Sequence, residues 1–146
     1  MFDFFNRKNL TFQYYGFDTN DKMILAGTEI HQNSANCFFS ALESEIQTAD
    51  YLVAGSIFNI KLEAPYEDRR EYSLHTLKKM NLLCTKAFSF NMLTSYSDPE
   101  RMKQRPDLFY ADPCFYFDYC KRNFSRNVAL LHDYELFDFT IIVRKK

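Results

Sequence analysis

The chain has 146 residues, of which 47% are hydrophobic, and this is enough to bury one globular core. Its formal net charge of −1 provides no overall field to recruit nucleic acid, and no apolar run reaches the ~18 residues that a membrane span needs. Its first residues are too short and too acidic for a signal peptide. We therefore expect a single cytoplasmic domain over residues 1–146 that binds neither nucleic acid nor membrane.

The cysteines and histidines do not fall at the spacings of a metal site, and no C-x-x-C pair occurs. They are Cys37, Cys84, Cys114 and Cys120, with His31, His75 and His132. We expect reduced thiols and no bound metal.

The first predicted strand, residues 10–17, ends in a single acidic residue, Asp18, and a helix start follows at residues 19–20. Two interpretations of Asp18 stay open. A carboxylate at the end of such a strand can accept hydrogen bonds from a ribose hydroxyl at the carboxyl edge of an α/β sheet. Asp also frequently caps the helix that follows a strand.

The next segments alternate between helix and strand. Apolar residues at helical spacing predict a helix over 21–30, and a short strand candidate follows at 35–40. Residues 49–58 form an almost continuous apolar run, which is typical of a parallel strand covered on both faces, so we expect this strand in the centre of a sheet. A long helix over 67–85 then leads to an alternating strand over 87–94.

The carboxyl-terminal part begins with a polar segment, residues 94–110, that is long for a connection and typical of a functional loop or lid. Asp112 followed by Pro113 predicts the start of a helix that continues to about residue 124. Strands at 128–134 and 137–144 are separated by two residues, which leaves room only for an antiparallel return.

This order of elements resembles the class I S-adenosylmethionine-dependent methyltransferases, and in particular bacterial methyltransferase-domain proteins. The segments that carry the likeness are 54–59 (AGSIFN), 90–94 (FNMLT), 108–113 (LFYADP), 132–134 (HDY) and 139–145 (FTIIVRK). The likeness covers most of residues 9–146. It implies an α/β fold with an incomplete Rossmann-like methyltransferase sheet, in which parallel strands are followed by a carboxyl-terminal antiparallel hairpin.

The same resemblance identifies what this sequence lacks. In the family, a first strand and a Gly-rich turn cradle the methionine part of the cofactor, because only Gly lets the backbone approach so closely. That turn precedes the ribose-binding acid by about 20 residues, and counting back from Asp18 passes residue 1. The glycines are Gly16, Gly27 and Gly55, and none of them has the spacing of the turn. The position of the family's adenine-binding acid holds Leu42, and Glu43 is one residue late.

By position, the resemblance implies five residues that bind S-adenosylmethionine: Asp18, Met23, Ser56, Phe58 and Asn59. It implies Asp18 for the ribose hydroxyls, Met23 as an apolar contact near the adenine, and the other three beside the sulfonium and substrate. For Met23 a second interpretation stays open, because a methionine on a helix face usually belongs to the core.

Three residues are candidates for the acceptor side. If the strand over 128–134 is parallel to the others, its carboxyl end opens on the ligand edge, and His132 can serve as a general base. The alternative is a structural histidine that orients the hairpin. Tyr110 and Asp112 bound the predicted lid and are candidates for substrate binding.

Two functions follow. In the first, the chain is a methyltransferase for a small-molecule or sugar acceptor, truncated and impaired in cofactor binding. In the second, it is a non-catalytic remnant domain that binds a partner or itself. Loss of the first strand would expose inner edges of the strands at 10–17 and 50–58. Either these strands pair directly, residues 1–8 fill the gap, or a second copy closes it, and we expect a homo-oligomer.

Overall fold

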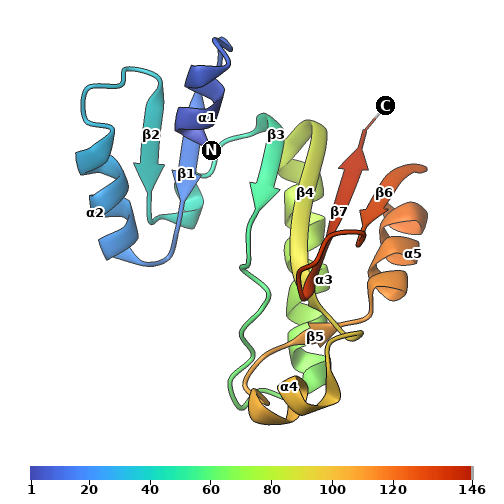
Figure 1. The fold of residues 1–146 in the computed structure, drawn as a ribbon. Coiled ribbons are helices and arrows are strands. Elements are labelled where there is room, and N and C mark those ends of the chain that lie inside the picture. The colour runs from blue at the N-terminus through green and yellow to red at the C-terminus, as the bar shows by residue number, and fades with distance from the viewer. Residues whose placement is uncertain (146) are drawn as a thin grey trace. The chain divides into compact units, whose positions relative to one another are not determined.

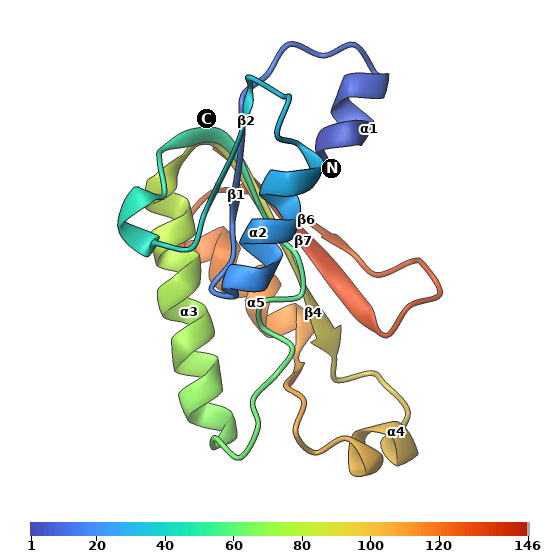
Figure 2. The ribbon, with the colours of Figure 1, turned by 90° about the vertical axis from the view of Figure 1, so that its left-hand side faces the viewer.

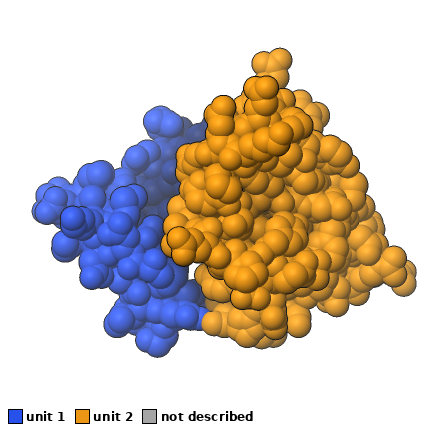
Figure 3. All heavy atoms as spheres, turned by 90° about the horizontal axis from the view of Figure 1, so that it is seen from below, with its two compact units in different colours: residues 1–47 blue, residues 48–146 orange. Residues whose placement is uncertain are grey.

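A computed structural model describes residues 1–145, and the chain divides into two compact units, Met1–Gln47 and Thr48–Lys146 (Figures 1 and 3). Each unit has its own sheet. Among residues 1–145, no helix combines the length and apolar character that crossing a bilayer requires.

The first unit contains a two-stranded parallel sheet. Its elements are α1 (Phe2–Arg7), β1 (Tyr14–Phe17), α2 (Asp21–Ile30), β2 (Cys37–Ser40) and a short 3₁₀ helix, η1 (Glu43–Glu45). Helix α2 begins where the sequence predicts it, because the side chain of Asn20 accepts a hydrogen bond of 3.0 Å from the backbone N–H of Lys22. Strand β1 is shorter than predicted, since it begins at Tyr14.

The amino-terminal segment is a helix, so it supplies no strand to either sheet. Phe2 is 4% exposed and places its ring edge-on against Phe12, Tyr14 and His31, with centroids between 4.7 and 5.8 Å away. This aromatic cluster ties α1 to the rest of the first unit.

A phenylalanine ring fills the space between two glycines of the first unit. A Cβ atom on Gly16 of β1 would lie 2.5 Å from the ring of Phe39 in β2, and one on Gly27 of α2 would lie 2.9 Å from the same ring. Neither distance is compatible with a real side chain. These two glycines therefore let the ring of Phe39 pack directly against the backbone of both elements.

The second unit is a five-stranded sheet with helices along one face. Its elements are β3 (Ala49–Ala54), α3 (Tyr66–Leu83), β4 (Cys84–Thr94), α4 (Pro99–Gln104), β5 (Tyr110–Ala111), α5 (Pro113–Asn123), β6 (Asn127–Leu131) and β7 (Asp138–Arg144). The strand order is β3-β4-β7-β6, and β5 pairs in parallel with the end of β4. Strands β3 and β4 are parallel, while β7 runs antiparallel to both β4 and β6. The predicted α/β fold with a terminal antiparallel hairpin is confirmed (Figure 2 shows the β6–β7 hairpin and the loop that carries α4).

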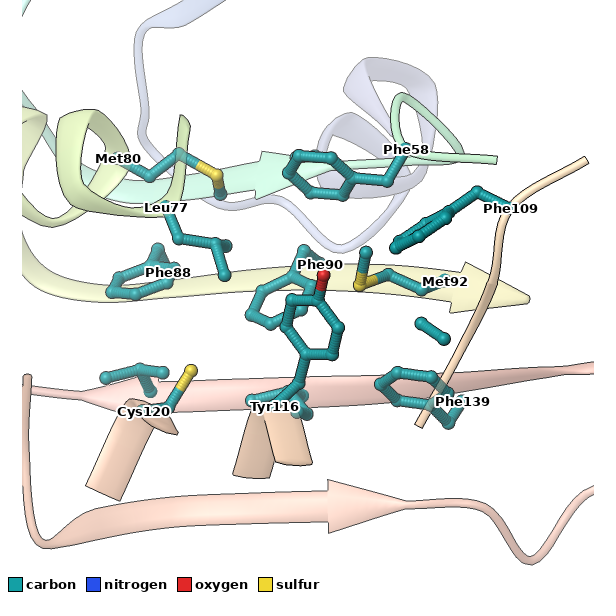
Figure 4. Close-up of a cluster of buried hydrophobic side chains, with 14 of the residues drawn as sticks. Phe58, Leu77, Met80, Phe88, Phe90, Met92, Phe109, Tyr116, Cys120 and Phe139 are labelled. Carbon is teal, nitrogen blue, oxygen red and sulfur yellow. The ribbon is translucent and has the colours of Figure 1, made fainter. Parts of the chain in front are cut away.

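The core of the second unit lies between the sheet and helices α3 and α5 (Figure 4). Alternate residues of β4 face this core, and Phe88, Phe90 and Met92 are at most 1% exposed. The two helices are joined by a hydrogen bond of 2.5 Å between the hydroxyls of Ser73 on α3 and Tyr116 on α5. Burial raises the pKa of Tyr116 well above its usual range, so this hydroxyl stays neutral and available for the hydrogen bond.

Strand β3 does not have the central, doubly covered position that its apolar run predicts. It lies at the edge of its sheet, and Tyr51 and Val53 are 66% and 52% exposed. The reason is that α3 covers only the face of Leu52 and Ala54. Strands β1 and β3 belong to different sheets, and within residues 1–145 each has one edge that no strand of its own sheet pairs.

Candidate functional site

The carboxyl edge of the five-stranded sheet gathers the candidate residues of the second unit. Strand β6 is parallel to β3 and β4, because both β4 and β6 are antiparallel to β7. The segments that follow β3, β4 and β6 therefore emerge at one edge, where ligands of open α/β sheets bind. His132 directly follows Leu131, the last residue of β6, and therefore lies at this edge. A role as general base required its strand to be parallel to β3 and β4, and it is.

A hydrogen-bond network fixes the turn after β3. Ser56 has a φ of 60°, a left-handed conformation that costs a non-glycine residue about 1–2 kcal/mol. Its backbone N–H donates to Oδ1 of Asn91 on β4 at 2.7 Å, and Nδ2 of Asn91 donates to Oδ2 of Asp138 on β7 at 2.6 Å. The other oxygen, Oδ1 of Asp138, is buried and has no partner within residues 1–145. Three strands thus hold the strained turn in place.

A second asparagine, Asn59, also holds this turn in place. The side-chain oxygen of Asn59 accepts the backbone N–H of Leu93 at 3.2 Å, and its carbonyl accepts the N–H of Phe109 at 2.9 Å. Asn59 therefore ties the turn both to β4 and to the segment before β5. At Gly55 the backbone faces open space, because an added Cβ would meet no atom within 4 Å. A ligand could approach the chain there.

Phe58 is a core residue. It is 0% exposed, and its ring packs edge-on against Phe90 with centroids 5.9 Å apart. Arg69 on α3 holds the backbone on either side by donating to the carbonyls of Ile57 and Phe58. The side chain of Phe58 is thus part of the core, and its contact with the cofactor stays a prediction.

His132 lies against two aromatic rings. Its half-buried imidazole is 5.9 Å from the ring of Tyr96 and meets Phe139 edge-on at 6.3 Å. Sequence reasoning missed Tyr96, which stands in a loop without periodicity. The signal that could have found it is position, because Tyr96 lies two residues past the carboxyl end of β4, at the ligand edge.

Asp112 caps helix α5, as its sequence predicts. Its Oδ1 accepts the backbone N–H groups of Cys114 at 2.8 Å and Phe115 at 3.3 Å. The Cys114 thiol, and after it the Asp112 carboxylate, raises the pKa of the nearby Tyr96 hydroxyl. Tyr110 on β5 has a buried hydroxyl without a partner in residues 1–145. Substrate binding by Tyr110 and Asp112 stays a prediction.

Asp18 lies half-buried just past the end of β1 in the first unit. Its Oδ1 accepts the backbone N–H of Asn20 at 2.8 Å, and Asn20 is the residue that caps α2. Asp18 thus supports the capping residue without itself being the cap, and no hydrogen bond within residues 1–145 uses its second oxygen. Met23 is 58% exposed, so its interpretation as a core residue is wrong and its contact with the adenine stays a prediction.

The loop predicted to be functional contains α4 and borders a cavity of about 690 Å³. The lining residues are Asp98, Pro99, Glu100, Arg101, Gln104 and Phe137. The guanidinium of Arg101 stacks over the ring of Phe137 at 4.2 Å. The cavity lies beside the loop that carries His132, because Phe137 belongs to that loop.

The part of the chain that the structure describes has no cluster of metal-binding side chains, and its cysteines form no disulfide. Residues 1–145 hold no group of three or more His, Cys, Asp or Glu side chains that could bind a metal ion. The four cysteines are free thiols, and burial raises the pKa of Cys120 to about 12, which keeps it protonated.

Comparison with known proteins gives one relative by sequence and several by structure, while no family model matches. The chain is 41% identical over 145 residues to "Putative methyltransferase Rv1506c" of Mycobacterium tuberculosis H37Rv, which covers 99% of this chain and 86% of that relative. The fold is similar to magnesium protoporphyrin IX methyltransferase of Synechocystis PCC 6803 with bound SAH (TM-score 0.65, 10% identity, 92% of this chain, 64% of that one). It is also similar to a chain of the Pnkp1/Rnl/Hen1 RNA repair complex (TM-score 0.62, 13% identity, 99% of this chain). This chain spans 35% of the RNA repair chain and 64% of the magnesium protoporphyrin IX methyltransferase, which is less than two thirds of each.

Proposed function

Because this chain belongs to the class I S-adenosylmethionine-dependent methyltransferases, we propose that it serves methyl transfer to a small-molecule or sugar acceptor and that residues 1–146 alone bind the cofactor weakly. The observation that carries this proposal is the sheet. The second unit has the strand order β3-β4-β7-β6, and in the first unit strand β1 is followed directly by Asp18. No residue among 1–145 provides the Gly-rich turn. The alternative is a non-catalytic remnant domain.

The residues of the chain fit one half of S-adenosylmethionine and not the other. The free second oxygen of Asp18 suits a ribose hydroxyl, and the exposed Met23 suits the face of an adenine ring. The methionine half needs a close approach to the backbone, but the ring of Phe39 fills the space beside Gly16 and Gly27. Gly55 alone faces open space. The expected consequence is a cofactor held by its adenosine end.

The residues of the second unit would act on the acceptor. When bound, the cofactor supplies an electrophilic methyl group on sulfur. Ser56 and the backbone at Gly55 line the open end of β3, where the acceptor would bind. His132 has no hydrogen bond to its ring nitrogens within residues 1–145, so it is free to accept the proton of an acceptor hydroxyl. Tyr110 and Asp112 would border the acceptor.

We expect S-adenosylhomocysteine to bind residues 1–146 with a Kd no tighter than roughly 1 mM, which corresponds to about −4 kcal/mol. Titration followed by ¹⁵N chemical shifts should move the signals of residues 18–23. Asp18→Asn should remove the binding, because a charge-assisted hydrogen bond to the ribose is lost. Asp21→Asn is the matched control, since Asp21 lies in the first turn of α2 and leaves the end of β1 unchanged.

Two results would contradict this expectation. Micromolar binding would show that the missing turn is not needed. Absence of any shift at residues 18–23, even at the highest concentration of S-adenosylhomocysteine, would favour the remnant domain over the enzyme.

A small acceptor is more consistent with the charge of the chain than a nucleic acid. The net charge is −1, and two arginines near the candidate site already have partners: Arg105 pairs with Asp107, and Arg101 stacks on Phe137. One similar structure belongs to an RNA repair complex, but this is a property of that protein and does not support an RNA acceptor for this chain.

The unpaired edge of β3 suits association with a second copy. An edge strand of six residues with exposed Tyr51 and Val53 is a template for strand pairing. We expect light scattering to show a dimer that Val53→Lys weakens, because a charge on an edge strand opposes pairing. Leu82→Lys is the control, since Leu82 is 78% exposed on α3. A monomer at every concentration of the unaltered chain would contradict the dimer.

A further inference from the structure

Tyr96 is an exposed aromatic side chain on a rigid support. It is 69% exposed, yet two residues of the same turn, Thr94 and Ser97, are only 2% and 4% exposed. The backbone N–H of Tyr96 donates to Oγ1 of Thr94 at 3.2 Å, and the Ser97 hydroxyl donates to the carbonyl of Thr94 at 2.8 Å. The Thr94 N–H in turn donates to the carbonyl of Phe137 at 3.0 Å. The turn therefore presents the ring in a fixed position.

The ring of Tyr96 is paired with that of His132. The two ring planes are inclined by 32° with their centroids 5.9 Å apart, and Phe139 supports the imidazole from its other side. A large exposed aromatic ring on a rigid turn is pre-organised to stack on a ligand, because little conformational entropy is lost when the ligand binds.

Carboxylates predominate among the charges near this pair, where the Arg101 guanidinium is stacked over the ring of Phe137. The Asp112 carboxylate lies near the Tyr96 hydroxyl, and the carboxylates of Asp138 and Asp133 lie near Tyr134 in the loop after β6. Within residues 1–145, neither Asp112 nor Asp133 forms an ion pair with an arginine or lysine. A phosphate or carboxylate on the acceptor would therefore be repelled.

We propose that Tyr96 and His132, whose rings lie against each other, together form one wall of an acceptor site that selects a neutral, ring-bearing alcohol and rejects anionic acceptors. This inference rests on the proposed methyl transfer and names the substrate class of the same site. Tyr96 supplies the stacking face, and the imidazole of His132 lies beside it, where it can receive the proton of the acceptor hydroxyl.

Phenol and phenyl phosphate are a pair of probes that share the phenyl ring, and the ester carries a charged phosphoryl group in place of the hydroxyl hydrogen. In ¹⁵N titrations of the whole chain without cofactor, phenol should shift the signals of residues 94–97 and 132–133, and phenyl phosphate should bind several-fold more weakly. Tyr96→Ala should weaken the binding of phenol roughly tenfold, which is the typical loss for one stacked ring. Tyr96→Phe should keep most of it, since the ring remains.

Tyr72→Ala is the control, because Tyr72 is 51% exposed on α3. Equal loss in Tyr72→Ala and Tyr96→Ala would overturn the proposal. So would tighter binding of phenyl phosphate than of phenol, or a short RNA oligomer that shifts the same signals at lower concentration. Because these titrations need no cofactor, failure of S-adenosylhomocysteine to bind would count against the proposed methyl transfer and leave the phenol result intact.

Discussion

Replacing Phe90 by alanine should lower the free energy of unfolding of the second unit by about 3–5 kcal/mol, because it removes the ring on which the core of this unit is assembled. Phe90 is 1% exposed and lies 5.9 Å from the ring of Phe58 and 6.4 Å from the rings of Phe88 and Tyr116. These neighbours come from the turn after β3, from β4 itself and from α5. They cannot collapse into the cavity without giving up their own contacts.

Urea unfolding followed by circular dichroism measures this loss. Leu82→Ala is the control, because Leu82 is 78% exposed on α3 and its truncation should change stability by no more than about 0.5 kcal/mol. A loss below about 1 kcal/mol for Phe90→Ala would mean that the core relaxes around the cavity, contrary to the close packing seen in Figure 4.

Replacing His132 by alanine should reduce methyl transfer by about 10²–10⁴-fold, the usual contribution of a positioned general base. The experiment is best made in a relative that has the Gly-rich turn and a histidine at this position, so that transfer is fast enough to follow. Binding of the cofactor should be unchanged, because the replacement affects only the acceptor side.

Glu135→Ala is the control in the same loop. Glu135 is exposed, so a general effect on the loop would appear in both variants. Unchanged turnover in His132→Ala would exclude the general base and leave His132 with the structural role of supporting the hairpin against Phe139.

Helices α2, α3 and α5 were the most predictable elements of the fold, whereas α1 and α4 were not predicted. The starts of α2 and α5 depend only on nearby residues, because the side chains of Asn20 and Asp112 cap them. The edge position of β3 was not predictable, because an apolar run shows that a strand can be buried but does not show what covers it. The partner of a strand is decided by distant segments.

The candidate site was predictable where position along a strand decides it and not where packing decides it. His132 and Ser56 follow from strand ends at the carboxyl edge. Phe58 was assigned to the ligand by the same rule, but the turn directs its ring into the core. The link from Ser56 through Asn91 to Asp138 depends on the register of three strands, which no local pattern specifies.

The packing of Phe39 between Gly16 and Gly27 couples the residues that these three positions can hold. A side chain gained at either glycine has to be matched by a smaller residue at position 39, so substitutions there should occur together in related sequences. Two of the three glycines of this chain, Gly16 and Gly27, are thus committed to one ring. A Gly-rich cofactor turn could not be built from these two positions.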